Sequence, residues 1–216
     1  VPGVEADDEE KPSEDVLTPK DIKKMIGVCD NIRDKLMIVL LYESAARIGE
    51  ALQLRLRNVD ITNKKYILLR IPKGKTKSRV IPLIYAAPYV TQYLNSENID
   101  LEKDKDRPLF LTKKKVDDGE RRALNEPGVR KVLRNAIERA KINKPFNPHW
   151  LRHSRLTELG KELKEAELRV YAGWGRGSLM AKVYVHIEDK DVQDKLLGNA
   201  GLITTEHQTK TEVFKV

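Results

Sequence analysis

Cysteine and histidine are scarce in this sequence: its 216 residues contain one cysteine and four scattered histidines. A single thiol excludes an internal disulfide and fits a reducing compartment, so we expect a cytoplasmic protein. Cys29 falls in the apolar helical register of Ile22, Met25 and Ile26, which predicts a position in the core. The scattered histidines and the lone cysteine form no pattern typical of a metal site, and we expect no metal.

Long apolar runs and a leader are also missing. No stretch of about 18 apolar residues occurs, so the sequence predicts no membrane-spanning helix. The chain opens at Val1 and not at Met, and no basic and apolar leader follows. We therefore expect Val1 to mark a boundary within a longer protein.

Acidic residues are concentrated at the start of the chain. Residues 1–15 hold seven acids and one lysine, a net charge of −6, whereas the whole chain carries +8, so the remainder carries about +14. A basic body of this size attracts a polyanion, with nucleic acid the leading candidate. The alternative is the Lys/Glu-rich surface of a heat-stable protein. Residues 1–16 show no hydrophobic periodicity and are expected to form an acidic, flexible linker or tail.

The apolar pattern predicts a mainly helical (α+β) domain with one small antiparallel sheet. Thr18-Pro19 is a helix start, and later helices are expected over 32–43, from about 47, and over 86–95, 128–140, 150–162, 165–172 and 189–197. Residues 66–71 and 79–83 have strand composition and are joined by a basic hairpin connection. The highly charged residues 102–126 are expected to form a loop. One main domain over 17–201 and a C-terminal tail over 202–216 complete the prediction.

Three segments place charged or aromatic residues in patterns that indicate chemistry. In ARIGE (46–50), Arg47 has apolar neighbours and needs a partner or a ligand, and Glu50 one turn later is the simple partner. HWLRHS (149–154) spaces His149 and Arg152 three residues apart at a helix start, where a phosphate is favoured, although such pairs are also common on surfaces. GWGRGSLMAKVY (173–184) contains Trp174, which also fits a core aromatic, and ends at Tyr184.

In this order the three segments resemble the tyrosine recombinase (phage integrase) family over roughly residues 15–200, and the step of ten residues from Trp174 to Tyr184 resembles its archaeal integrases. The resemblance implies that Tyr184 is the nucleophile. It implies that Arg47 and Arg152 hold the non-bridging oxygens of the scissile phosphate, for which a planar, bidentate guanidinium is suited. It further implies that His149 assists proton transfer and that Trp174 donates its indole N–H to a phosphate oxygen.

The basic hairpin connection carries three lysines, a feature that by itself indicates solvated charge or phosphate contacts. In the family, a lysine on this hairpin protonates the leaving oxygen. The string KTKSRVIP (75–82) lacks a Gly of the family pattern, so Lys75 is favoured as this acid and Lys73 stays as the alternative. His153 is expected to pack beside the site. The candidate DNA contacts are Lys73, Lys77, Arg79 and Arg176.

The resemblance implies the catalytic domain of a site-specific recombinase, an integrase of a mobile element. Such an enzyme cleaves and rejoins double-stranded DNA through a 3′-phosphotyrosine, which retains the energy of the broken bond, so no cofactor is expected. Self-association into a tetramer on DNA is also implied. The alternatives are a type IB topoisomerase-like relaxing enzyme with the same catalytic set, a non-catalytic DNA-binding module, and a generic basic helical protein.

Overall fold

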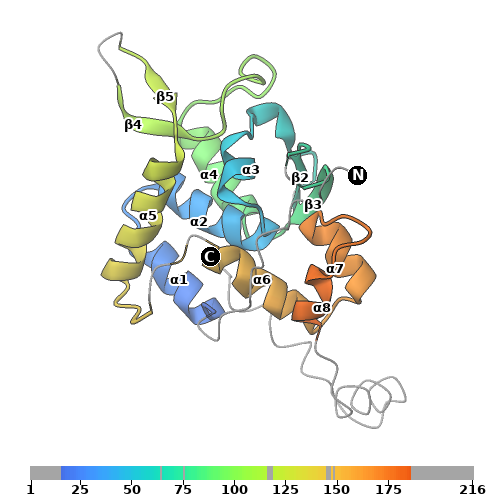
Figure 1. The fold of residues 1–216 in the computed structure, drawn as a ribbon. Helices are drawn as coiled ribbons and strands as arrows, with labels where there is room; N and C mark the ends of the chain where they lie inside the picture. Colours follow the sequence, from blue (N-terminus) through green and yellow to red (C-terminus); the bar gives the residue numbers. More distant parts are fainter. Residues whose placement is uncertain are drawn as a thin grey trace, which may run out of the picture.

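The computed structural model describes residues 16–63, 65–74, 76–115, 119–144, 147 and 149–185. These residues form a mainly helical domain, as the sequence predicts. Figure 1 shows α2 in the middle of the domain, where it contacts α1, α4 and α6. The helices of the described residues are α1 (Pro19–Gly27), α2 (Ile32–Ser44), α3 (Ile48–Leu52), the 3₁₀ turn η1 (Leu56–Asn58), α4 (Ala87–Ser96), α5 (Glu126–Arg139), α6 (Trp150–Gly160), α7 (Glu165–Ala172) and α8 (Met180–Tyr184).

Two antiparallel sheets accompany these helices. The strands β1 (Val59–Asp60), β2 (Ile67–Ile71) and β3 (Arg79–Leu83) form one sheet in that order. The strands β4 (Leu111–Lys115) and β5 (Arg121–Ala123) form a second, two-stranded sheet. The prediction of a loop over 102–126, and of a single sheet, was therefore wrong. Most positions of β4 and β5 are exposed and charged, so no apolar alternation marks them as strands.

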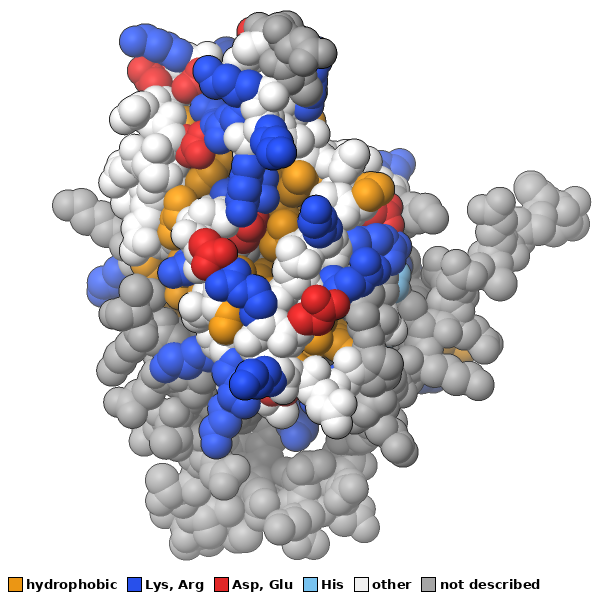
Figure 2. Space-filling model, turned by 90° about the vertical axis from the view of Figure 1, so that its left-hand side faces the viewer, with side chains coloured by type: hydrophobic (Ala, Val, Ile, Leu, Met, Phe, Trp, Pro, Cys, Tyr) orange, Lys and Arg blue, Asp and Glu red, His pale blue; other side chains and the backbone are white. Residues whose placement is uncertain are grey.

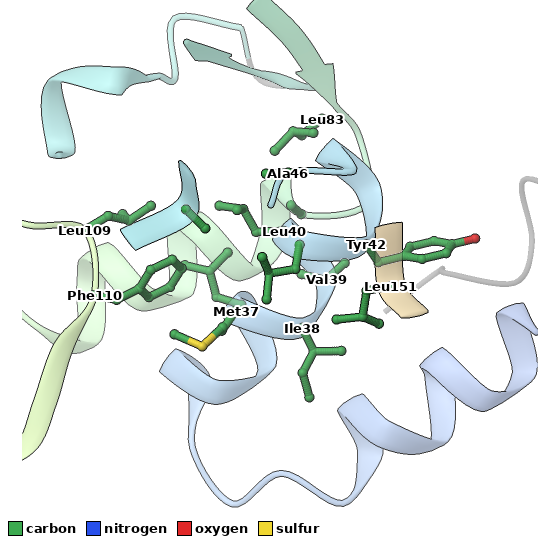
Figure 3. Close-up of a cluster of buried hydrophobic side chains, with 14 of the residues drawn as sticks. Met37, Ile38, Val39, Leu40, Tyr42, Ala46, Leu83, Leu109, Phe110 and Leu151 are labelled. Carbon is green, nitrogen blue, oxygen red and sulfur yellow. The ribbon is translucent and has the colours of Figure 1, made fainter. Parts of the chain in front are cut away.

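The core is built around α2, which is buried on nearly every side. Its N-cap Asn31 accepts a hydrogen bond from the backbone N–H of Asp34, and the helix then carries apolar side chains around its whole circumference. In Figure 3 the side chains of α2 point in several directions, toward Phe110 on one side and toward Leu151 of α6 on the other. Because α2 is buried, its C-terminal end sets the position of the segment that leads into α3.

A second apolar cluster joins α6, α7 and α8 to the end of α2 at Ala45. The short helix α8 was not predicted from the sequence, and the helix expected over 189–197 lies outside the described residues. Gly160, the last residue of α6, lies so close to α8 that an added Cβ would be 2.1 Å from the carbonyl oxygen of Tyr184. Helix α8, which carries Tyr184, is therefore part of the core.

The first helix begins where the sequence predicts. Thr18 and Asp21 form a capping box, in which the Thr18 hydroxyl accepts a hydrogen bond from the backbone N–H of Asp21 at 3.2 Å. Across the described part of the chain, every helix is too short or too polar to cross a membrane.

Candidate active site

Arg47 lies where α2 gives way to α3, and its guanidinium has an unused donor. Ala45 adopts a left-handed conformation (φ 47°) that turns the chain, and Arg47 is the N-cap of α3. Its Nη1 is buried and has no hydrogen-bond partner among the residues that the structure describes. The Glu50 carboxylate accepts a hydrogen bond from the backbone N–H of Arg47 but pairs with the guanidinium of Arg79. A buried donor of this kind is costly unless an anion satisfies it.

Arg47 and His149 line the same cleft, which has a volume of about 290 Å³. His149 immediately precedes α6 and is half-buried. Glu126 and Arg130 of α5 form another part of the wall, and the Arg130 Nε donates to Glu126 at 2.8 Å. The cleft thus brings together one predicted phosphate ligand and the histidine predicted to assist proton transfer.

Arg152 is 2% exposed and is held at the junction of three elements. Its Nη1 donates to the carbonyl of Ala45 at 2.5 Å and its Nη2 to the carbonyl of Ala172 at 3.2 Å. The guanidinium also lies over the indole of Trp174, with its Cζ 5.5 Å from the ring centroid. These bonds fix Arg152 beside Ala45, which precedes Arg47 by two positions in the chain. Both acceptors are backbone oxygens, which do not neutralise the positive charge of the guanidinium.

Tyr184 is buried in this arrangement, with 4% of its surface exposed. Its ring stacks with that of Trp174 at a centroid distance of 5.7 Å and an interplanar angle of 19°. The hydroxyl of Tyr184 lies 2.5 Å from Nδ1 of His153. The rings of His153 and Tyr184 are stacked, with their centroids 6.0 Å apart. His153, which the sequence predicts as a packing residue, therefore contacts the predicted nucleophile directly.

Trp174 has the core packing predicted for it, and its predicted role as a phosphate donor stays a prediction. It follows Gly173, which ends α7 in a left-handed conformation (φ 75°), and it packs in the second apolar cluster. Its Nε1 is nevertheless buried without a hydrogen-bond partner among the described residues. Trp174 thus has a buried donor beside Arg152 and Tyr184.

The β2–β3 hairpin carries the remaining candidates. Lys75 lies outside the described residues, whereas Lys73 and Lys77 are exposed, as is Arg176 in the turn before α8. Arg79, predicted as a DNA contact, is instead 7% exposed and points inward to Glu50. The sequence could not separate it from its exposed neighbours, because its partner lies 29 residues earlier in the chain.

The charge state of Glu50 follows from these contacts. Burial raises the pKa of its carboxyl, but the hydrogen bond and the positive charge of Arg79 outweigh burial and hold the pKa below its ordinary value. Glu50 is therefore ionised at neutral pH. Within the described part of the chain, no three His, Cys, Asp or Glu side chains gather as a metal ion would require.

Residues 15–191 match the Phage integrase family, and the chain belongs to this family. It is 30% identical over 206 residues to transposase A of transposon Tn554 from Staphylococcus aureus, an alignment that covers 89% of this chain and 54% of the relative. Its fold is similar to that of the XerH site-specific recombinase in a post-cleavage complex with a palindromic difH substrate (TM-score 0.65, 24% identity, 87% of this chain and 53% of that chain). It is also similar to the Tn1549 transposon integrase in complex with transposon right end DNA (TM-score 0.61, 18% identity, 90% and 68%).

The chain spans about half the length of the curated relatives that it matches. The described fold is that of the family's helical catalytic domain with its small antiparallel sheets.

Two residues of the site were assigned other roles from the sequence. His153 follows Arg152 directly, and only the position of α8, 31 residues later, brings Tyr184 to it. Arg79 was counted with the basic residues of the hairpin. No local signal marks either contact, because each depends on how distant elements pack.

Proposed function

We propose that this chain is the catalytic domain of a tyrosine site-specific recombinase that cleaves and rejoins double-stranded DNA through Tyr184. The observation that carries the proposal is that Arg47 Nη1 and Trp174 Nε1 are two of the buried side-chain donors that have no hydrogen-bond partner among the described residues. Both belong to segments that also position Arg152 and Tyr184. An anionic, oxygen-rich group such as a phosphodiester would satisfy them.

The chemistry follows from the placement of these groups. The Tyr184 oxygen attacks the scissile phosphorus, its proton passes to a neighbouring histidine, and the DNA 5′-oxygen leaves with a proton from a hairpin lysine, Lys75 or Lys73. Arg47 and Arg152 stabilise the charge that develops on the phosphate oxygens. The 3′-phosphotyrosine is later attacked by a 5′-hydroxyl, which releases Tyr184 and reseals the strand.

The described arrangement represents a resting state of this site. Tyr184 is buried between Trp174 and His153, and it is not among the residues that line the cleft of Arg47 and His149. Attack therefore requires the Tyr184 phenol and the scissile phosphate to come together when DNA is bound.

Double-stranded DNA is the proposed substrate, and a tetramer on DNA is the proposed assembly. The Tn1549 transposon integrase, which has a similar fold, was solved with transposon DNA, and this supports the choice of substrate. Residues 17–201 would form the catalytic domain, with an acidic tail over 1–16 and a C-terminal tail over 202–216. A reaction on DNA together with the lone Cys29 supports the cytoplasm as its location.

Strand transfer tests the function. A pool of nicked duplexes with randomised sequence around the nick would trap a covalent adduct, and a second duplex with a free 5′-hydroxyl would then be added. We expect transfer of the trapped strand to the second duplex, and sequencing of the product would reveal the preferred site. Relaxation of a supercoiled plasmid without any strand transfer would favour a topoisomerase-like enzyme, and DNA binding without an adduct would favour a non-catalytic module.

A further inference from the structure

Arg79, the first residue of β3, makes a buried, two-pronged ion pair with Glu50 of α3. Its Nη2 lies 2.9 Å from Oε2 of Glu50 and its Nη1 lies 3.4 Å from Oε1. The side chains of Arg79 and Glu50 are 3% and 5% exposed. Oε2 of Glu50 also accepts the backbone N–H of Arg47 at 3.0 Å. The pair therefore connects the strand that follows the lysine hairpin to the segment that presents Arg47.

Thr76, at the tip of the β2–β3 hairpin, closes the pair into a three-residue cluster. Its hydroxyl accepts a hydrogen bond from Nη1 of Arg79 at 2.8 Å and donates one to the Glu50 carboxylate. The backbone carbonyl of Thr76 accepts the N–H of Gly74 at 3.1 Å, which tightens the turn. The hairpin tip is thus held by a charged side chain and does not simply extend into solvent.

The same cluster contacts the residue before Trp174. An added Cβ at Gly173 would lie 2.8 Å from Nη1 of Arg79 and 3.0 Å from Cβ of Thr76, so only glycine fits there. The backbone N–H of Lys77 donates to the carbonyl of Gly173 at 2.9 Å. Gly173 also needs its positive φ of 75° to end α7. Three segments with predicted catalytic residues therefore meet at Arg79.

A buried ion pair is a weak source of net stability, because the desolvation of both charges offsets much of their attraction. Its value lies in geometry: the planar guanidinium can satisfy both oxygens of Glu50 only in one orientation. An arrangement of this kind fixes the relative position of the segments that it joins.

We propose that Arg79 is a positioning residue that, through Glu50, Thr76 and the backbone at Gly173, holds the tip of the lysine hairpin against Arg47 and Trp174 and does not contact DNA. This inference rests on the proposed function, in which a hairpin lysine protonates the leaving 5′-oxygen. Loss of Arg79 would misplace that lysine, so the step that suffers is protonation of the leaving group.

The test compares single-turnover cleavage by Arg79→Gln on two nicked duplexes, one with the normal 5′-bridging oxygen and one with sulfur at that atom. Sulfur leaves without a proton. We expect cleavage of the oxygen substrate to fall by about 100-fold, the lower end of what a general acid contributes. The sulfur substrate should be cleaved within about threefold of the unsubstituted protein, because protonation no longer limits the reaction. Lys73→Ala and Lys75→Ala, run in parallel, show which lysine is the acid.

Arg70→Gln is the matched control. Arg70 lies on the adjacent strand β2 and pairs with Asp60 at 3.5 Å, but its side chain is 56% exposed. This variant removes one arginine from the same sheet and should cleave both substrates normally. Thr76→Val provides a milder variant if Arg79→Gln does not fold, because it removes only the hydroxyl between Arg79 and Glu50. It should show the same sulfur rescue after a smaller loss, about tenfold.

The outcomes separate the inference from the proposed function. Equal losses on both substrates, or no loss on either, would overturn the positioning role of Arg79. A fall of about 0.9 in the salt slope of DNA binding by Arg79→Gln would also overturn it, since that change marks a lost phosphate contact. Failure of the unsubstituted protein to form an adduct on either substrate would contradict the proposed function instead.

Discussion

At the scale of single residues, the contact between His153 and Tyr184 is the least expected feature of the site. The phenol oxygen and Nδ1 are 2.5 Å apart, and both side chains are buried. A buried hydroxyl needs a hydrogen-bond partner, and the histidine is positioned both to hold the phenol and to take its proton. The predicted nucleophile is therefore hydrogen-bonded to a histidine of the HWLRHS segment for which the sequence predicts only a packing role.

His153→Phe tests this contact, because it keeps an aromatic ring and removes the nitrogen. We expect the free energy of unfolding to fall by about 1–3 kcal/mol, the cost of leaving a buried polar group without its partner. Denaturant unfolding of His153→Phe, Tyr184→Phe and the double variant would measure the coupling between them. We expect a coupling of at least about 0.5 kcal/mol. Strictly additive effects would show that the hydrogen bond contributes nothing.

At the scale of elements, α8 is held by its close approach to the end of α6. Tyr184 carries its backbone carbonyl into the space that a side chain at Gly160 would occupy. The two helices also share the second apolar cluster, with Leu159, Ala181 and Tyr184 among its buried members. The position of Tyr184, the predicted nucleophile, thus depends on a backbone contact as well as on its own side chain.

Gly160→Ala should displace α8 and lower the free energy of unfolding by about 1–3 kcal/mol, as overpacking of a core does. Gly27→Ala is the matched control, since Gly27 is also the last residue of a helix but has open space around it. That variant should be neutral or slightly stabilising. Thermal unfolding of the two variants compares them directly, and equal melting temperatures would contradict the close packing of α8.

The sequence predicted elements well where their signals are local. The capping residues Thr18 and Asp21 and the apolar face of α1 lie within one helix, so its start could be predicted. The strands β4 and β5 were missed because they consist mostly of lysine and arginine and show no alternation of apolar and polar residues. The dipeptide Asp118-Gly119 between them is a turn signal in the sequence. The motif residues Arg47 and Arg152 could be named from the resemblance to the family, because their segments match its motifs in order. Their partners could not, because Arg152 bonds to carbonyls that are distant in sequence.

At the scale of the whole molecule, the charge is strongly uneven. The chain outside residues 1–15 carries about +14, given the total of +8 and the −6 of that segment. Figure 2 shows the face that contains α5 and the β4–β5 hairpin, where Lys and Arg side chains are spread from top to bottom with fewer acidic side chains between them. A surface of this kind favours a polyanion and makes its binding sensitive to salt.

Salt dependence locates the DNA-binding face. Replacement of the exposed Lys73, Lys77 and Arg176 by Ala should weaken DNA binding and reduce the slope of log K against log salt by about 2.7, since each phosphate contact contributes about 0.9. The matched control replaces three exposed lysines of α1, Lys20, Lys23 and Lys24, and removes the same charge. Titrations at several salt concentrations should give a smaller slope for the Lys73, Lys77 and Arg176 variant than for the control variant of α1. Identical losses would mean that the hairpin and the turn before α8 are not the binding face.

The identity of the nucleophile is the central claim, and covalent trapping tests it most directly. A nicked suicide duplex is incubated with the unsubstituted protein, Tyr184→Phe and the control Tyr89→Phe, and the adduct is digested and mapped by mass spectrometry. We predict an adduct on the peptide that contains Tyr184, its retention in Tyr89→Phe, and its complete loss in Tyr184→Phe with DNA binding nearly unchanged. An adduct that persists in Tyr184→Phe, or that maps to another residue, would contradict the account.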